Sequence, residues 1–513
     1  MSLRDSNVVI IETSRTHIRA GLGLQELLRT PSVELFARVG LRKTDSSEAN
    51  GEASTSKPAG VAKLGPQAQV TDYLVGHLLD EALGGPDAQD VVVSWPFVTG
   101  EVADWVAAEA LWKHVLFTHL QRKRTVNESP VLITLPSPIP SRNLYERTCQ
   151  IFFERFNVPA FAILDRPLAQ LYAANTLSGI VVDIGQDSTD ITPINESLII
   201  HSAKTTTKIG TRMCRHYLAH LLKSNSSVMK TLFPSTSAVD EATIHATLLR
   251  LANHLVAAGL VKPPSSGEAA PPPEDEGVTD IAAIVVAGKE KAVIESGMKK
   301  KLNAKASAAE QARAREIEAL DLATIEFEGK EITVGKERHR FCEPLLDPAV
   351  VAGLGLERFG ASISTTVARG EEGLPPLQWG EGGPRVESLQ DAVGRAVGQA
   401  DFDLRQYLWQ GLFVTGDVTR FVKGIGVSLQ SRLSPFIATL VETDVQPRSI
   451  RVLNVPEYYA EYRETGNGYA TFLGSSIVAK IIFNDHSSKN FLSKADYTAK
   501  GPHGIIEMSP SLL

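Results

Sequence analysis

Acidic, basic and glycine residues stand at two bends where an apolar run turns back on itself. The first bend, VVIIETSRTHIRAGL (residues 8–22), carries Glu12, Ser14 and Arg15 directly after a short apolar run. An acid at the end of a buried strand, followed by a tight turn, is an arrangement that can hold phosphate and Mg²⁺. We therefore expect two strand–turn–strand hairpins around one polar site. The second bend, GIVVDIGQDSTDITPI (residues 179–194), supplies Asp183, Gly185, Gln186 and Asp190.

A third segment, FVTGDVTRFVKGIG (residues 413–426), reads as a strand, a turn at Gly416 and Asp417, and the start of a helix. Ser141 precedes a helical pattern and is expected to cap it. The alternation of strand and helix patterns around these segments predicts an α/β fold. The clearest strand patterns are 131–135, 160–164, 411–415 and 450–455, and the clearest helical patterns are 142–156, 213–222, 389–397 and 474–482.

The length and composition of the chain exclude several classes of protein. A chain of 513 residues is too long for one core, so we expect two or more domains or a bilobed body. The net charge of -7 gives no reason to expect nucleic-acid binding through a broad basic surface. We expect no membrane span, no signal peptide and no metal site, and the three cysteines are too far apart for a disulfide framework. These are Cys149, Cys214 and Cys342.

In their order along the chain, these segments resemble the actin superfamily. Residues 8–22 resemble its first phosphate loop, 132–194 are similar to actin throughout, and 413–426 resemble the adenosine loop. Residues 325–348, RVLNVPE and FLGSSIVAKI resemble later actin segments, so the resemblance covers about two-thirds of the chain. It implies the duplicated, ribonuclease-H-like α/β fold that actins share with chaperones and sugar kinases, with two lobes around a cleft.

The resemblance also divides the chain. Residues 1–165 and 485–513 would form the first lobe, and residues 166–484 the second. Low apolar content and Pro-rich composition mark the segments that depart from the family pattern. These are a mobile loop at 43–63, an insertion at about 225–320, and a Pro-rich linker within it at 261–277.

The first phosphate loop differs from the family pattern. Actins place an Asp before a glycine-rich turn, whose backbone amides close on the phosphates. Here Glu12 takes the place of that Asp, and the turn 13–16 has no glycine, so each Cβ obstructs a close backbone approach. Arg15 stands where a small residue is usual, and it either contacts phosphate or fills the site.

The second loop keeps Asp183 and Gly185 and changes the positions that serve the metal and the attacking water. Gln186 replaces a second acid, and a neutral amide binds a divalent cation less well than a carboxylate. Asp190 replaces a histidine that helps arrange the attacking water. Arg166 replaces the glutamine that orients this water, and an arginine cannot accept a proton from it.

In the adenosine loop, Gly416 and Asp417 take the place of two glycines, so a carboxylate enters where the nucleotide would pack. Together these changes predict that ATP hydrolysis is lost, that the protein is not an enzyme, and that it uses no cofactor. Weak ATP binding stays open, because Asp183, Gly185 and Gly416 remain. The alternative for these three residues is structural: the acid would bind backbone amides, and the glycines would form tight turns.

The resemblance implies a second functional region, where actins receive helices of partner proteins. An apolar surface of this kind suits the apolar face of an amphipathic helix. The alternative is that these residues are intramolecular core, above all Val478 and Ile481. The predicted partner surface consists of Tyr172, Asn175, Leu177, Val478, Ile481, Ile482 and Phe491.

Within the family, the degenerate loops, Arg166 and the charged, Pro-rich insertion most resemble the fungal actin-related subunits of SWI/SNF and RSC chromatin remodellers. That resemblance implies a nuclear protein that pairs with an actin-related protein 7-like partner. It also implies docking on the HSA helix of the remodeller ATPase, and contact with chromatin through the complex. One alternative is an active ATPase of the superfamily, favoured by the spacing of Asp183 and Asp190. The other is a cytoskeletal actin-related subunit, which would be cytoplasmic.

Overall fold

The structure is a computed structural model. Of the predicted mobile loop at 43–63 and the predicted linker at 261–277, only residues 43 and 261–263 lie within the described residues. The described residues are 8–23, 29–43, 68–136, 141–234, 240–263, 321–351, 354, 371–375, 386–437, 449–484 and 490–508.

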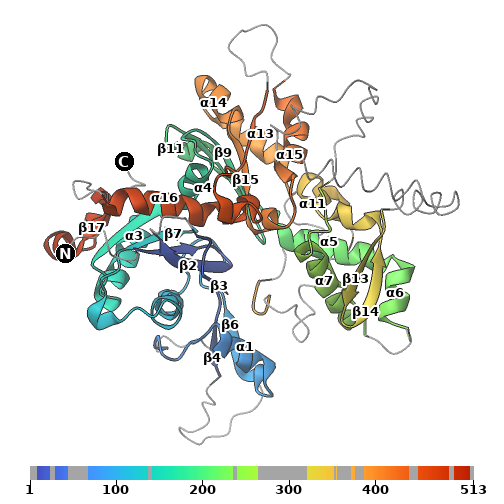
Figure 1. Cartoon of the computed structure of the whole chain (residues 1–513), viewed down its shortest axis with the longest axis horizontal. Coiled ribbons are helices and arrows are strands. Elements are labelled where there is room, and N and C mark those ends of the chain that lie inside the picture. Colours follow the sequence, from blue (N-terminus) through green and yellow to red (C-terminus); the bar gives the residue numbers. More distant parts are fainter. Residues whose placement is uncertain are drawn as a thin grey trace, which may run out of the picture.

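The first sheet has six strands in the order β17-β8-β7-β1-β2-β3 (Figure 1). β1 and β2 form an antiparallel hairpin, whereas β7 runs parallel to β1 and β8 runs parallel to β7. Every residue of β1 is buried, which explains its continuous apolar run. The bounds are β1 Val8–Thr13, β2 His17–Gly23, β3 Val33–Phe36, β7 Val131–Leu135, β8 Ala160–Asp165 and β17 Leu492–Ser493.

The second sheet repeats this arrangement. Its order is β11-β10-β9-β15-β16, with β12 also paired to β10. β9 and β10 form the hairpin, β15 is parallel to β9, and β16 is parallel to β15. The same order in both sheets confirms the duplicated α/β fold predicted from the sequence. The bounds are β9 Gly179–Ile184, β10 Thr189–Asn195, β11 Leu198–Ile199, β12 Thr205–Thr207, β15 Leu412–Thr415 and β16 Val452–Leu453.

Smaller groups of elements extend from both sheets (Figure 1). A three-stranded sheet, β5-β4-β6, lies beside α1 near the first sheet, and the β13–β14 hairpin lies with α5, α6 and α7 beyond the second. The strands are β4 Val39–Arg42, β5 Leu74–Val75, β6 Val91–Ser94, β13 Ala323–Phe327 and β14 Lys330–Val334. The helices are α1 His77–Gly84, α5 Thr211–Lys223, α6 Ser226–Leu232, α7 Glu241–Ala257, α11 Glu343–Leu346, α13 Leu389–Gln399, α14 Arg405–Trp409 and α15 Ile425–Leu433.

Side-chain caps start α2 and α3 of the first lobe. The Asp104 carboxylate accepts hydrogen bonds from the first amides of α2 (Trp105–Lys113), at 2.9 and 3.1 Å. Ser141 caps α3 (Arg142–Gln150) as predicted, because its Oγ accepts from the amide of Leu144 at 3.2 Å. Each helix continues into a wider helical turn, at 114–119 and 151–155, which accounts for the longer helix predicted at 142–156.

Three buried clusters form the core, and the third lies between the two sheets. It joins side chains of β1 and β7 to those of β9 and β15 through α4 (Arg166–Ala173) and α16 (Ala470–Asn484). α16 crosses the centre of the molecule and packs along α4 (Figure 1). A Cβ on Gly474 would lie 1.7 Å from the Ala169 carbonyl oxygen, so only glycine allows this approach. The two lobes therefore meet in a packed layer.

After α16 the chain returns to the first sheet. β17 pairs with β8, and Leu492 and Ile505 belong to the same buried cluster as α2 and α3. The last helices are α17 (Lys494–Lys500) and α18 (Gly504–Met508). Within the described residues, no helix is long and apolar enough to cross a membrane.

The first part of the insertion predicted at about 225–320 is helical and packed. α6 and α7 fill this part of the chain, and Leu248, Leu251 and Leu255 of α7 are fully buried in the core that also contains α5. The apolar residues of α7 recur at helical spacing and face that core. α6 and α7 thus pack with the second lobe, and residues 235–239 and 264–320 of the predicted insertion lie outside the described residues.

Candidate functional site in the cleft

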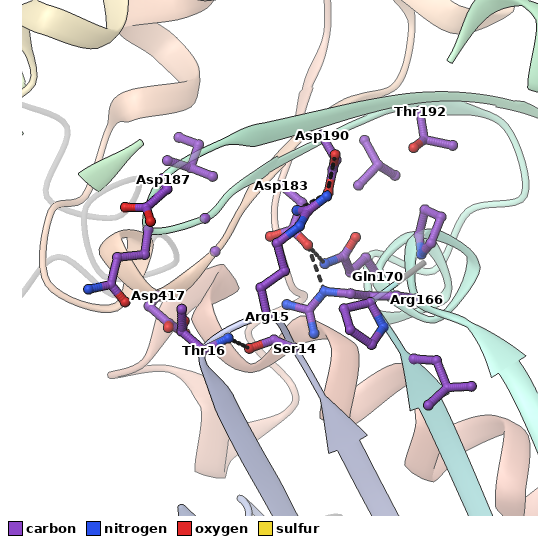
Figure 2. A pocket seen from close by; sticks show the side chains of 18 of the residues that line it. Ser14, Arg15, Thr16, Arg166, Gln170, Asp183, Asp187, Asp190, Thr192 and Asp417 are labelled. Carbon is purple, nitrogen blue, oxygen red and sulfur yellow. Dashed lines mark hydrogen bonds and ion pairs between the residues drawn. The ribbon is translucent and has the colours of Figure 1, made fainter. Parts of the chain in front are cut away.

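A polar cavity lies between the turns of the two hairpins and the turn that follows β15 (Figure 2). Glu12 lies behind it, with 1% of its side chain exposed, and hydrogen bonds to Arg166. The other predicted site residues all line this cavity. They are Ser14, Arg15, Arg166, Asp183, Gly185, Gln186, Asp190, Gly416 and Asp417.

The first turn closes on itself through Ser14. The Ser14 Oγ accepts hydrogen bonds from the backbone amides of Thr16, at 3.4 Å, and His17, at 2.9 Å. The Ser14 amide donates to the His17 carbonyl at 2.8 Å. The amides of Ser14, Thr16 and His17 therefore already have acceptors within the turn, which leaves them poorly placed to hold a phosphate.

Arg15 spans the cavity and binds Asp190 of β10 (Figure 2). Both guanidinium Nη atoms contact the carboxylate, Nη2 to Oδ1 at 3.1 Å, which is a bidentate ion pair. The Thr206 hydroxyl donates to the same carboxylate at 2.6 Å. Burial alone would raise the pKa of Asp190, but Arg15 outweighs burial and lowers it below its usual value. Of the two roles predicted for Arg15, the structure supports filling the site.

Arg166 joins the acids of the two hairpins. Its Nη1 donates to Glu12 of β1 and its Nε to Asp183 of β9, both at 2.7 Å. Although burial opposes the charge, Asp183 and Glu12 raise the pKa of Arg166 above its usual value. A permanently charged guanidinium thus stands between the two acids, where a divalent cation would otherwise offset their charge.

Asp183 binds side chains, and the alternative that it satisfies backbone amides finds no support. Its Oδ2 accepts from Arg166 Nε at 2.7 Å and from Gln170 Nε2 at 2.8 Å. Gln170 also donates to the Thr471 hydroxyl of α16, at 3.1 Å. Asp183 therefore fixes two side chains of α4 at the base of the cavity.

Arg19 of β2 is as enclosed as Glu12, with 1% of its side chain exposed. It donates to Glu12 at 3.2 Å and to Glu34 at 2.8 Å, and its Nη2 binds Asp417. Burial disfavours its charge, but the three carboxylates raise the pKa of Arg19 well above its usual value. Asp417 responds in the opposite sense: Arg19 and His17 overcome burial and hold its pKa well below the usual range.

Glu34 of β3 extends the network to the outer edge of the cleft. It accepts from Arg420 at 2.9 and 3.1 Å and from the Tyr469 hydroxyl at 2.9 Å. The Arg420 guanidinium also lies over the Tyr469 ring, 4.3 Å from its centroid. His17 Nδ1 lies 3.1 Å from the Asp417 carboxylate on the same side.

The turn of the second hairpin is held against the start of α5. The carbonyls of Gly185 and Gln186 accept from the amides of Thr211 at 3.0 Å and Arg212 at 2.9 Å. The Asp187 carboxylate pairs with the Arg212 side chain at 2.7 Å. Burial raises the pKa of Asp187, and Arg212 lowers it only in part.

Gly416 is required by backbone geometry. Its φ is 114°, and a Cβ there would lie 2.2 Å from the carbonyl oxygen of Ile184 in β9. Gly185 is similarly close to the Ser188 carbonyl, which receives its amide at 3.0 Å. The structural alternative for both glycines is therefore supported, because each is needed for a tight turn or a close approach of two strands.

A nucleotide with its metal ion does not fit these residues. The cavity has a volume of about 60 Å³, room for a few water molecules at about 15 Å³ each. Pockets for small molecules usually begin near about 300 Å³. The turn amides, the acids and the arginines are already bound to one another. Across the described residues, no group of three or more His, Cys, Asp and Glu side chains is arranged to hold a metal ion.

A larger hollow, about 460 Å³, opens on the far side of the Glu34–Arg420 pair. Its charged groups are also paired with each other: Arg38 donates to Asp80 at 2.6 Å, and Arg420 to Glu34. Sequence reasoning did not identify this hollow.

Sequence reasoning also missed several members of the ion-pair network. Arg19 gave one usable signal, a charge inside the otherwise apolar strand HIRAGLG. Gln170 gave another, since it lies on the buried face of α4. The remaining residues have no local pattern that points to the cleft. They are His17, Glu34, Arg420 and Tyr469.

The predicted partner surface contains both exposed and buried residues. Leu177 and Ile481 are 58% and 62% exposed, whereas Val478 and Ile482 are buried in the cluster between the sheets. Asn175 has a φ of 56° and ends α4, so it has a structural role of its own. Tyr172 and Phe491 are half-buried against the same cluster.

One exposed residue beside this surface was missed. Leu198 of β11 is 59% exposed, and the amide of its neighbour Ser197 donates to the Leu177 carbonyl at 2.8 Å. Leu198 is therefore a further exposed apolar residue, adjacent in the chain to a residue that hydrogen bonds to the backbone of Leu177.

Comparison with known proteins gives the chain relatives along its whole length. The family profile described as "Actin" matches residues 4–509. The protein named "SWI/SNF and RSC complexes subunit arp9" of Schizosaccharomyces pombe is 25% identical over 564 residues, covering 98% of this chain and 99% of that protein. Two proteins named "Actin-related protein 7", from Oryza sativa subsp. indica and subsp. japonica, are 37% identical over 134 residues. That match covers 26% of this chain and 37% of each rice protein.

Proposed function

The chain belongs to the actin family, and we propose that it is a non-catalytic structural subunit of a nuclear chromatin-remodelling complex of the SWI/SNF or RSC type. The similarity to the arp9 subunit along nearly all of both chains supports this class, that of fungal actin-related protein 9. In this role the protein binds no nucleotide, pairs with an actin-related protein 7-like partner, and docks on the HSA helix of the remodeller ATPase. It meets chromatin through the complex.

The non-catalytic role is supported by the cleft, because side chains of the protein itself fill it. Arg15 lies between the hairpins, and Arg166 forms ion pairs with both Glu12 and Asp183. Hydrolysis needs room for the phosphates and a group that accepts a proton from the attacking water. The cavity offers too little volume, and Arg166 cannot accept that proton.

The docking role is supported by the predicted partner surface. Leu177 follows the end of α4 and Ile481 lies on α16, and both expose most of their side chains. α4 and α16 pack against each other. An amphipathic helix that placed its apolar face here would remove this area from water. The half-buried Tyr172 would lie at its edge, with a hydroxyl able to hydrogen bond.

The complex is tested by purifying the tagged protein from its own cells and identifying stoichiometric partners by mass spectrometry. We expect a helicase-type ATPase and a second actin-related protein, and a fluorescent tag should locate in the nucleus. Cytoskeletal partners with a cytoplasmic tag would contradict the proposal.

The docking surface is tested with Leu177→Asp and Ile481→Asp. Each should weaken binding of the ATPase-derived helix at least about tenfold, because a carboxylate would be buried against apolar groups. Val427→Asp is the matched control, since Val427 is 60% exposed on α15, away from this surface. Equal binding by all three variants, each folded, would remove the docking proposal.

Loss of nucleotide chemistry is tested by calorimetry and phosphate release with Mg²⁺-ATP. We expect neither binding heat at micromolar ATP nor turnover. Micromolar affinity together with turnover would replace the structural role with an active ATPase.

A further inference from the structure

The ion pairs of the cleft link the two lobes as well as filling the space between them. Arg15, in the first turn, binds Asp190 of β10. Arg19 of β2 binds Asp417, in the turn after β15. Each of these pairs joins an element of the first sheet to an element of the second.

Two further contacts complete the connection. Glu34 of β3 accepts from Arg420, which follows β15, at 2.9 and 3.1 Å. Arg166, at the start of α4, holds Glu12 of β1 and Asp183 of β9 at equal distances of 2.7 Å. The first lobe supplies cations in two pairs and an anion in a third, so neither lobe presents a face of one charge.

The charges nearly cancel within this set. Four arginines meet five carboxylates, and Lys204 also lines the cavity. Every arginine in the set is bound to a carboxylate, so none is free to bind a triphosphate. Every carboxylate is bound to an arginine, so no two of them are free to bind a divalent cation. The carboxylates are Glu12, Glu34, Asp183, Asp190 and Asp417, and the arginines are Arg15, Arg19, Arg166 and Arg420.

We propose that these contacts form a clamp that holds the lobes together in place of a nucleotide and its metal ion. The cleft clamp is defined as Arg15–Asp190, Arg19–Asp417, Glu34–Arg420, and Arg166 with Glu12 and Asp183. The closed arrangement of the lobes then needs no ligand. This inference rests on the proposed function in one respect, that the protein uses no nucleotide.

Burial strengthens the inner part of the clamp, whereas Glu34 and Asp417 are 32% and 38% exposed. Arg19 and Glu12 are each 1% exposed, and Arg166 is 13% exposed, so water screens these charges poorly. Opening the cleft would separate these ion pairs and leave buried charges without partners. An unpaired buried charge raises the free energy of the protein. The pair Arg15–Asp190 is more accessible, at 19% and 20%, and can be altered without emptying the core.

The test is hydrogen exchange on the full chain with Arg15→Gln, Asp190→Asn and the double variant. Each single change should speed exchange about tenfold in both hairpin turns, 14–17 and 185–188, and the double variant should add little to either. Arg15→Lys keeps the charge and one hydrogen bond, so it should give a smaller effect. Arg395→Gln is the control, because its bidentate partner Glu387 lies in the same lobe; the turns should be unaffected.

Two results would overturn the clamp. One is unchanged exchange, or faster exchange confined to the turn that carries the substitution. The other is slower exchange in both turns of the unaltered protein when Mg²⁺-ATP is added, since closure would then depend on a ligand. If the clamp fails and the remodeller partners still copurify, the proposed function as a complex subunit stands without it.

Discussion

The two ends of α4 face opposite kinds of environment. At its start, Arg166 is enclosed in the cleft with Glu12 and Asp183 as partners. Past its end, Leu177 exposes 58% of an apolar side chain. The packing of α16 along the same helix connects the two regions.

The two regions differ in whether their side chains find partners within the chain. Charged groups in the cleft bind one another, so they are satisfied within the chain. The apolar side chains of Leu177 and Ile481 can leave water only if another molecule covers them. The cleft charges are thus paired within the chain, whereas Leu177 and Ile481 stay exposed to water unless the proposed partner covers them.

The largest expected effect comes from Arg19→Met, which leaves Glu12, Glu34 and Asp417 without their shared cation. We expect the free energy of unfolding to fall by about 3–5 kcal/mol, because one partner of a buried charge cluster is removed. Urea denaturation measures this, with Arg395→Met on the exposed surface as a control that should change little. A loss below about 1 kcal/mol would mean that the cleft charges do not depend on one another.

Gly416→Ala should have the next largest effect. The new Cβ would meet the Ile184 carbonyl oxygen at 2.2 Å, in a backbone conformation with φ of 114°. We expect a loss of about 2–4 kcal/mol in the free energy of unfolding. Gly398→Ala in α13 is the matched control, because no atom lies within 4 Å of its Cβ and alanine favours a helix. Equal results for the two variants would show that β9 and β15 can separate freely.

Mild acid should loosen α5 and α7 before it loosens the cleft. His216 Nδ1 and His245 Nε2 lie 3.0 Å apart between these helices. Burial, reinforced by His245 and nearby cations, holds the pKa of His216 well below its usual value; burial and Lys223 lower that of His245 to about 4. Both folded-state pKa values lie below the unfolded value of about 6.5, so stability is lost as pH falls from about 6.5 toward 4. The surrounding charged groups are Arg212, Arg215, His220, Lys223 and Glu241.

The acids of the cleft lose their contribution to stability at a lower pH than the two histidines do. The pKa values of Asp190 and Asp417 are lowered, so their contribution is present above the unfolded value of about 4 and is lost below it. At pH 5 we expect about 2 kcal/mol less stability, with faster hydrogen exchange in α5 and α7 and unchanged exchange in the hairpin turns. Replacing both histidines with glutamine should flatten this pH dependence. Faster hydrogen exchange in the hairpin turns at pH 5 would contradict the prediction that α5 and α7 loosen before the cleft does.

The smallest effect is expected from Ile481→Ser. Its side chain is 62% exposed, so the free energy of unfolding should change by less than about 0.5 kcal/mol. The neighbouring Ile482→Ser is the comparison, because Ile482 is 3% exposed and should cost about 3 kcal/mol. Similar costs at both positions would place Ile481 in the core and leave the partner surface without its central residue.

Local patterns in the sequence were enough for the hairpins, the Ser141 cap and the order of strands. Apolar runs of five or six residues, bounded by polar turns, correspond closely to β7, β8 and β9. They could not reveal which charges meet: Arg19 and Asp417 are 398 residues apart, and no spacing rule connects them. Nor did the sequence reading assign α7, within the predicted insertion, to the core that it forms with α5.

The position of Arg166 has a consequence for the symmetry of the molecule. Glu12 is the fifth residue of β1 and Asp183 the fifth of β9, and each stands opposite a threonine on the parallel strand, Thr134 or Thr415. Because the two halves repeat one arrangement of strands, each places an acid at the equivalent position, and the two negative charges, Glu12 and Asp183, lie close to each other. A single guanidinium, Arg166 at the start of α4, bridges both copies, and Arg19 supplies the second positive charge beside Glu12. Among the described residues, Arg166 has no counterpart in the other half, so the repeated acids of the two lobes share one bridging cation.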